Sequence, residues 1–135
     1  MPAPHTFGPS GRILDTSALA QAATGKSIYA RTLIELALAS GTNTLLIPVT
    51  AYIQALANIP QDLRWTLMLL TTSPGVQLDL IDDREKAHEI ADLGTPDPSL
   101  AHVAWCGLQY GWPLVTDRGP DLVQVSPDLQ IESLP

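Results

Sequence analysis

Short strand-like runs alternate with helical patterns along most of this chain, and this alternation constrains the fold more than any other feature. The strand-like runs cover residues 12–15, 44–48, 76–81, 113–116 and 129–134. The clearest helical pattern covers residues 97–111, where apolar residues recur at the spacing of one helix face. Strands that alternate with helices favour a parallel sheet covered on both faces. We therefore predict an α/β, three-layer domain with a central parallel sheet of about five strands.

The length and composition fit a single domain. The chain has 135 residues and neither an internal repeat nor a linker, so we predict a flexible lead-in over residues 1–11 and one domain over residues 12–135. Its apolar stretches are far shorter than the roughly 20 residues that cross a bilayer, and its N-terminus lacks a signal-peptide pattern. The single cysteine, Cys106, excludes an internal disulfide and suits a reducing compartment. We expect a cytoplasmic protein without membrane contact.

The charge balance is acidic, with a net charge of −7. General nucleic-acid binders present a basic face, because contacts to phosphates supply most of their affinity. The composition therefore argues against such a binder. Three alternatives remain: acids gathered around a cation, a surface that meets a basic partner, and an acidic surface that only serves solubility.

Polar residues follow the first, second and fourth predicted strands. Asp15 ends the first strand, Thr116 and Asp117 end the fourth, and residues 49–54 leave the second. In parallel sheets, ligands bind outside the carboxyl ends of the strands. If the first and fourth strands are neighbours, these groups converge on one edge, where we expect the functional site.

Asp15 opens the stretch LDTSAL, which has two interpretations. In the first, Asp15 caps the following helix, and Thr16 and Ser17 support its first turn. In the second, Asp15 coordinates a hard divalent cation, and Ser17 hydrogen-bonds the carboxylate or a substrate phosphate. The local sequence does not decide between them.

Three motifs in order resemble a PIN domain, the small nuclease fold of VapC-type toxins. They are LDTS at the end of the first strand, LLIP before a helix, and GWPLVTD near the C-terminus. The likeness covers about residues 12–134. It implies a ribonuclease that cleaves RNA with Mg²⁺ or Mn²⁺ held by carboxylates, a small antitoxin protein as partner and, as is common in the family, a homodimer.

The family acids carry over only in part. Asp15 matches the first acid, and Ser17 matches the hydroxyl that accompanies it. The second acid falls on Gln54, whose amide oxygen can still accept but carries no charge, and the third falls on Leu100. The resemblance therefore implies a depleted acidic site, more suited to one ion than to two.

The position of the fourth family acid and the polar residues near the third lie in the C-terminal third of the chain. The fourth acid falls on Arg118, while Asp117 lies one residue earlier, within reach of a turn. Asp97 and His102 are the polar candidates near the third acid; Asp97 also fits a helix N-cap, and His102 lies opposite the apolar stripe, which favours a surface or partly packed histidine.

The predicted site therefore has three groups of residues. The catalytic and metal-binding candidates are Asp15, Asp97 and Asp117; the supporting residues are Ser17, Gln54, His102 and Thr116; and the substrate-binding candidates are Lys26, Arg31 and Arg118. Two functions remain open. One is a metal-dependent endoribonuclease, and the other is a catalytically degenerate PIN domain that binds a protein or RNA.

Overall fold

A computed structural model describes residues 10–41 and 43–135. The strands are β1 (Gly11–Leu14), β2 (Thr44–Pro48), β3 (Val76–Asp79), β4 (Leu114–Thr116) and β5 (Ile131–Ser133). The helices are α1 (Thr16–Thr24), α2 (Ile28–Ser40), α3 (Val49–Asn58), the 3₁₀ turn η2 (Gln61–Leu63), α4 (Arg64–Thr71), α5 (Arg84–Ala91), α6 (Pro98–Tyr110) and α7 (Gly119–Val125).

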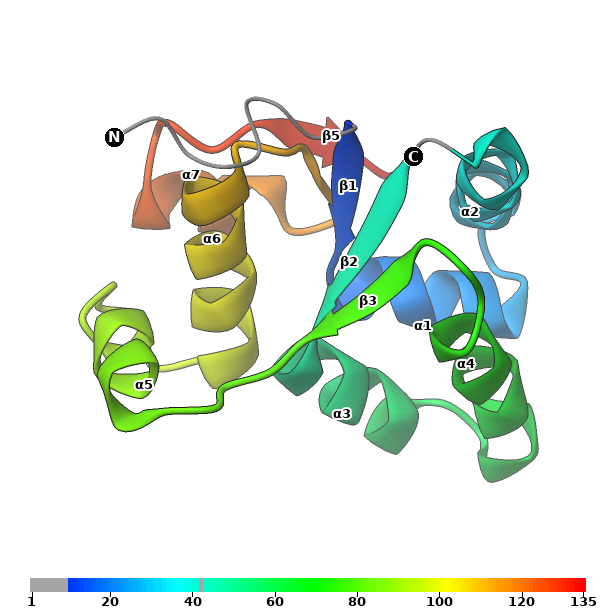
Figure 1. Cartoon of the computed structure of the whole chain (residues 1–135), viewed down its shortest axis with the longest axis horizontal. Coiled ribbons are helices and arrows are strands. Elements are labelled where there is room, and N and C mark those ends of the chain that lie inside the picture. Colours follow the sequence, from blue (N-terminus) through cyan, green and yellow to red (C-terminus); the bar gives the residue numbers. More distant parts are fainter. Residues whose placement is uncertain (1–9, 42) are drawn as a thin grey trace.

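The five strands form one parallel sheet in the order β3-β2-β1-β4-β5. The first strand is therefore central, and β4 is its direct neighbour, as the predicted edge requires. Helices α1, α2 and α4 lie on one side of the sheet, and α5, α6 and α7 lie on the other (Figure 1). The predicted three-layer α/β fold is confirmed.

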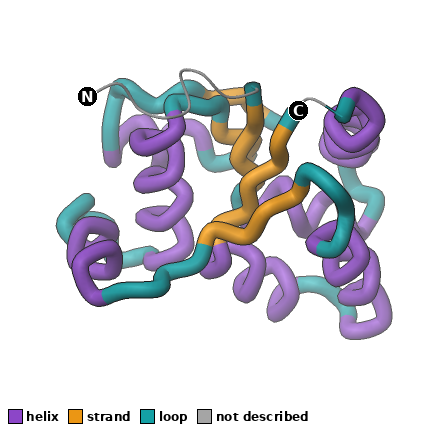
Figure 2. The backbone as a smooth tube through the Cα atoms, viewed as in Figure 1, coloured by secondary structure: helices purple, strands orange, loops and turns teal. Residues whose placement is uncertain are grey.

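Helix α3 links the two helical layers. It leaves β2 at the carboxyl edge and contacts both α1 and α6. The backbone tube shows it below the carboxyl ends of β1 and β2, between the two layers (Figure 2). The starts of α1, α3 and α6 therefore meet at one end of the sheet, where the sequence predicted a site.

Local capping signals define several helix ends. The Ser27 side chain accepts a hydrogen bond from the Ala30 amide at the start of α2, and Gly41 ends this helix in the left-handed conformation. Helix α7 was not predicted, because its 7 residues carry little periodicity and only Pro120 indicates a helix start.

Gly107 brings α6 close to the sheet. A Cβ atom at this position would lie 2.8 Å from a methyl carbon of Leu129 and 3.0 Å from one of Leu114. Both leucines belong to the buried core. The absence of a side chain at Gly107 therefore allows the close approach that presses the polar residues of α6 against β3 and α3.

The predicted boundaries differ slightly from the observed ones. Of the predicted lead-in, residues 1–9 lie outside the described residues, and Gly11 already belongs to β1. The last strand is shorter than predicted and covers Ile131–Ser133. Within the described ranges, none of the helices combines the length and apolar character that a bilayer crossing requires.

Candidate functional site at the carboxyl edge of the sheet

Asp15 lies at the centre of this edge and is 4% exposed. One carboxylate oxygen accepts hydrogen bonds from the Ser17 hydroxyl at 2.6 Å and the Ala18 amide at 2.9 Å. The other oxygen accepts from the Thr116 hydroxyl at 2.5 Å. Asp15 is thus the N-cap of α1, and the same side chain ties this helix to β4.

Burial raises the pKa of Asp15 above its ordinary value, because an ionised carboxylate is poorly solvated there. The hydrogen bonds from Ser17, Thr116 and Ala18 oppose this effect, and the nearby charge of Asp117 adds to it. Every donor that contacts Asp15 is neutral. The site therefore favours the protonated form of this carboxyl more than water does.

Asp117 lies beside Asp15 but points to solvent. The Asp117 amide donates to the Ser17 hydroxyl at 3.0 Å, and the same hydroxyl donates to Asp15. The Asp117 carboxylate is exposed and accepts a hydrogen bond from the Gln21 side chain at 2.9 Å. Ser17 therefore links the two predicted metal ligands, which lie on opposite sides of its hydroxyl.

Asp97 is neutralised by Arg118. Its second carboxylate oxygen lies 2.9 Å from an Arg118 guanidinium nitrogen, and the same guanidinium also binds Asp121 at 3.1 Å. The first oxygen of Asp97 caps α6 by accepting from the Ser99 and Leu100 amides. Burial raises the pKa of Asp97, but the hydrogen bond and charge of Arg118 outweigh this effect and lower it below its ordinary value.

A neutral hydrogen-bonded group fills the space between α1, α3 and α6. Thr16 donates to the Gln54 amide oxygen at 3.0 Å and is 2.8 Å from the Ser99 hydroxyl. Leu100, at the position of the third family acid, is buried in the core. Uncharged side chains therefore occupy both positions where the resemblance implies acids.

The predicted substrate-binding cations are dispersed. Arg118 is engaged by two carboxylates, while Arg31 donates to the Ala22 carbonyl at 2.9 Å on another side of α1. Lys26 is exposed and lines a shallow pocket of about 500 Å³ together with Asp117. No single basic patch is formed by these three side chains.

The described residues do not fit the multi-carboxylate metal site that the resemblance implies. Across residues 10–41 and 43–135, the one set of three carboxylate, imidazole or thiol ligand atoms within 4.8 Å of one another belongs to Asp79, His102 and Cys106. Asp15, Asp97 and Asp117 are not gathered in this way, and Arg118 already compensates Asp97. We therefore derive no catalytic step from a metal bound at this edge.

His102 corrects one sequence prediction. It is 0% exposed rather than at the surface, because α3 and α5 cover the parts of α6 that its main apolar stripe leaves open. Its ring does not support Asp15; Nε2 lies 2.7 Å from Asp79 and Nδ1 lies 2.9 Å from the Thr50 hydroxyl. The spacing of His102 and Cys106, four residues apart on a helix, was the signal that could have revealed this second group.

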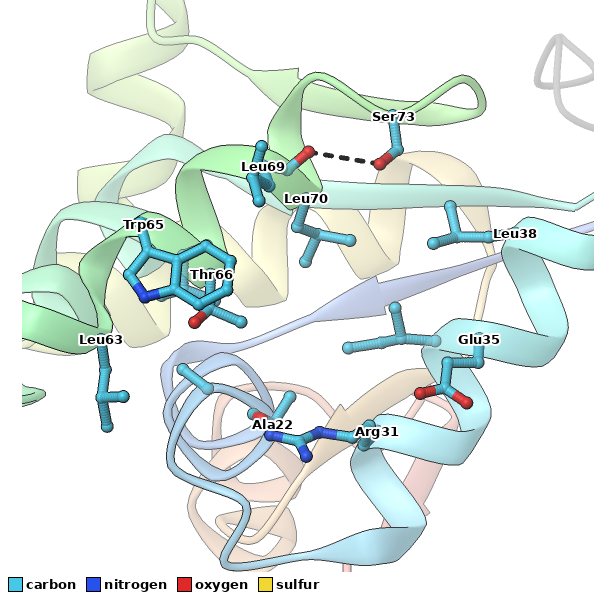
Figure 3. A pocket seen from close by; sticks show the side chains of 13 residues that line it. Ala22, Arg31, Glu35, Leu38, Leu63, Trp65, Thr66, Leu69, Leu70 and Ser73 are labelled. Carbon is cyan, nitrogen blue, oxygen red and sulfur yellow. Dashed lines mark hydrogen bonds between the residues drawn. The ribbon is translucent and has the colours of Figure 1, made fainter.

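An apolar groove lies between α2 and α4, away from the polar edge (Figure 3). Its volume is about 570 Å³. Trp65 and Leu69 rise from α4 beside the groove and are 58% and 57% exposed, while Arg31 and Glu35 border it on α2. Large apolar side chains that are exposed together commonly mark a protein contact.

Comparisons with known proteins support the fold. No family model matches the chain, and no curated protein sequence matches it. A solved structure of VapBC2 from Rickettsia felis, bound to a DNA fragment from its promoter, matches with a TM-score of 0.68 and 12% sequence identity. The match covers 93% of this chain and 99% of the other. At this identity, the likeness supports the PIN-like fold.

Proposed function

We propose that this chain is a PIN-like binding protein that engages an amphipathic helix of a small partner protein in the groove between α2 and α4. The observation that carries this proposal is the groove itself, an apolar channel of about 570 Å³ with exposed Trp65 and Leu69 at its rim. A helix with apolar residues at i, i+3, i+4 and i+7 is the common occupant of such a channel.

The charges and the structural relative support a protein partner. The chain carries a net charge of −7, so a basic partner is electrostatically favoured. The matched structure is that of VapBC2, a complex, and by analogy the partner of this chain is a small antitoxin-like protein. At the groove, Arg31 and Glu35 offer one charge of each sign, which can set the direction in which a helix binds.

The state of the polar edge favours binding over cleavage. Gln54 and Leu100 replace two family acids, and Arg118 neutralises Asp97. A PIN-type nuclease needs carboxylates free to hold a cation, and these contacts remove most of that capacity.

Binding to the product of the adjacent gene, measured by isothermal titration calorimetry, tests the proposal. Trp65→Asp and Leu69→Asp should each weaken binding by about tenfold or more, because they place a charge in a buried apolar contact. Val123→Asp is the matched control, since Val123 is an exposed apolar residue on α7, outside the groove. Equal affinity for all three variants would exclude the groove as the binding surface.

A metal-dependent ribonuclease remains the second candidate. The observation that favours it is the link from Asp15 through Ser17 to Asp117, which keeps two of the predicted ligands near each other. Structured RNA incubated with Mg²⁺ or Mn²⁺, with and without EDTA, tests it. We expect no cleavage; cleavage that EDTA and Asp15→Asn both abolish would overturn this expectation and establish the nuclease.

A further inference from the structure

A second polar cluster lies between β3, α5 and α6. Asp79 is the last residue of β3, and His102 and Cys106 are one turn apart on α6. His102 Nε2 lies 2.7 Å and Cys106 Sγ lies 3.3 Å from the same Asp79 oxygen, Oδ2. All three side chains are buried. A nitrogen, a sulfur and an oxygen ligand atom therefore converge inside the protein.

We propose that Asp79, His102 and Cys106 form a binding site for one thiophilic divalent transition-metal ion, such as Zn²⁺. This site shares no ligand with the group around Asp15, although Asp79 and Asp15 end strands at the same edge of the sheet, and the proposal does not depend on the proposed function. A solvent molecule would complete a four-coordinate shell.

The geometry is close to that of a bound ion. Bonds of about 2.0–2.3 Å in a tetrahedral arrangement place ligand atoms roughly 3–4 Å apart. The three ligand atoms all lie within 4.8 Å of one another. The distance between His102 Nε2 and Asp79 Oδ2, which is 2.7 Å, has to increase only slightly when an ion replaces the hydrogen bond.

A fourth side chain fixes the ring of His102. The Thr50 hydroxyl lies 2.9 Å from Nδ1, so that Nε2 is directed at Asp79 and Cys106. Metal-binding histidines characteristically have their other ring nitrogen held by such a partner. When Nε2 binds an ion, the ring proton resides on Nδ1 and is donated to Thr50.

The ligand types select the class of metal. A thiolate and an imidazole favour Zn²⁺ and Co²⁺, whereas Mg²⁺ and Mn²⁺ favour sites made of oxygen atoms. Binding breaks the S–H bond of Cys106, forms a bond between sulfur and the metal, and releases one proton to solvent. The Asp79 carboxylate and the Cys106 thiolate then supply two negative charges, which balance the two positive charges of the ion.

The Lys86 ammonium competes with a metal ion for the Asp79 carboxylate. Its ammonium lies 2.9 Å from Asp79 Oδ2 and 4.5 Å from the centre of the Trp105 ring. A metal ion at Asp79 has to displace this ammonium, and Glu89, three residues later on α5, offers a carboxylate for it nearer to solvent. Lys86 should therefore weaken metal binding without being a ligand.

Titration of the EDTA-treated 135-residue chain with Co²⁺ tests the site. Because Cys106 is the only cysteine, a near-ultraviolet thiolate-to-cobalt absorption band reports on this residue alone. We expect the band to saturate at one equivalent, to disappear when Zn²⁺ is added, and to persist in excess Mg²⁺ or Mn²⁺. Absence of the band in the wild type and in Lys86→Gln would overturn the proposal.

Two variants should move the affinity in opposite directions. Lys86→Gln should tighten Zn²⁺ binding, measured against a colorimetric chelator, by about tenfold, because a neutral amide is displaced more easily than an ammonium. Cys106→Ala should abolish high-affinity binding, and Asp15→Asn should bind like the wild type. A misfolded variant does not gain affinity, so tighter binding by Lys86→Gln supports the site. Equal Zn²⁺ affinity in Cys106→Ala and the wild type would overturn it.

Discussion

Two buried aspartates lie at the same edge of the sheet and are held by different kinds of donor. Ile13 pairs with Leu46, so that Asp15 is level with Pro48, and Pro48 itself pairs with Asp79. The two aspartates therefore lie on one row, with β2 between them. Both are less than a tenth exposed. Their positions along the strands are the same.

The pKa values of the two carboxyls shift in opposite directions. Burial raises the pKa of both groups. Asp15 accepts only from hydroxyls and a backbone amide, and its pKa remains raised. Asp79 accepts from an imidazole, a thiol and the Lys86 ammonium, and together they lower its pKa below its ordinary value. At Asp79 the hydrogen bonds from His102, Lys86 and Cys106, together with the Lys86 charge, outweigh burial, whereas the hydrogen bonds at Asp15 do not.

The two carboxyls therefore have different roles: Asp15 mainly connects structural elements, whereas Asp79 also holds a negative charge inside the protein. Asp15 joins α1 to β4 through neutral contacts. Asp79 joins β3 to α5 and α6 and carries a charge that a cation has to balance, which at present is that of Lys86. Unfolding free energies of variants at the two aspartates and at their partners test this contrast.

The largest effect is expected for Asp79→Asn. Removal of the carboxylate leaves the Lys86 ammonium without its partner at a site where its side chain is 15% exposed. Loss of one member of a buried pair costs about 3 kcal/mol of unfolding free energy. Urea denaturation at pH 7 in EDTA, followed by tryptophan fluorescence, measures this loss without a contribution from metal.

Asp83→Asn is the control for that change. Asp83 is exposed and caps α5 nearby, and Asn caps a helix about as well as Asp, so we expect a change of less than about 0.5 kcal/mol. Equal unfolding free energies for Asp79→Asn and Asp83→Asn would show that the buried pair adds nothing to stability.

Thr116→Val should cost about 2 kcal/mol, because it removes the donor to one Asp15 oxygen and leaves a buried carboxylate unsatisfied. Thr116→Ser keeps the hydroxyl and serves as the control. Chemical denaturation at pH 7 distinguishes the two. If Thr116→Val loses no more stability than Thr116→Ser, which keeps the hydroxyl, the hydrogen bond to Asp15 contributes little.

The two carboxyls should give opposite pH dependences. The pKa of Asp79 is lowered on folding, so its contribution is present above the unfolded value near 3.8 and is lost as the pH falls through the folded value. The pKa of Asp15 is raised, so its contribution is present below 3.8 and is lost as the pH rises through the folded value. Unfolding free energies of Asp79→Asn and Asp15→Asn, each relative to wild type across acidic pH, should therefore slope in opposite directions.

The smallest effect is expected for Asp15→Asn at pH 7. Asn can cap α1 in place of Asp, and it removes an ionised group that burial disfavours. We expect the unfolding free energy to change by less than about 0.5 kcal/mol. Thermal melting beside Asp79→Asn measures the contrast; a loss as large as that of Asp79→Asn would show that Asp15 is also held as a charge.

Local signals predicted the parts of the fold that depend on neighbouring residues. The strand over residues 44–48 has its predicted bounds, and the helical pattern over residues 97–111 contains α6 between its caps Asp97 and Gly111. An apolar run, a cap and a glycine act within a few residues of one another, and sequence patterns report such effects well. Helix α7 was missed because so short an element depends on packing against β5 and α6.

The candidate site could be predicted only as far as its place in the sheet. The order of the elements placed Asp15 at the edge and made Thr116 its neighbour. It did not show that Arg118 binds Asp97, or that His102 faces inwards. A helical stripe identifies one packed face, but α6 is also covered by α3 and α5, and a single periodicity does not reveal several neighbours.

The sequence by itself determined the alternation of strands and helices, offered Asp15 and Asp97 as helix caps, and located the edge at which polar groups collect. The tertiary structure alone decided which charges meet. The contact from Asp79 to His102 spans 23 residues, and that from Asp15 to Thr116 spans 101. Local patterns set backbone conformation, whereas the partner of a buried charge is set by the packing of distant elements, and that packing gave these two aspartates opposite electrostatic environments.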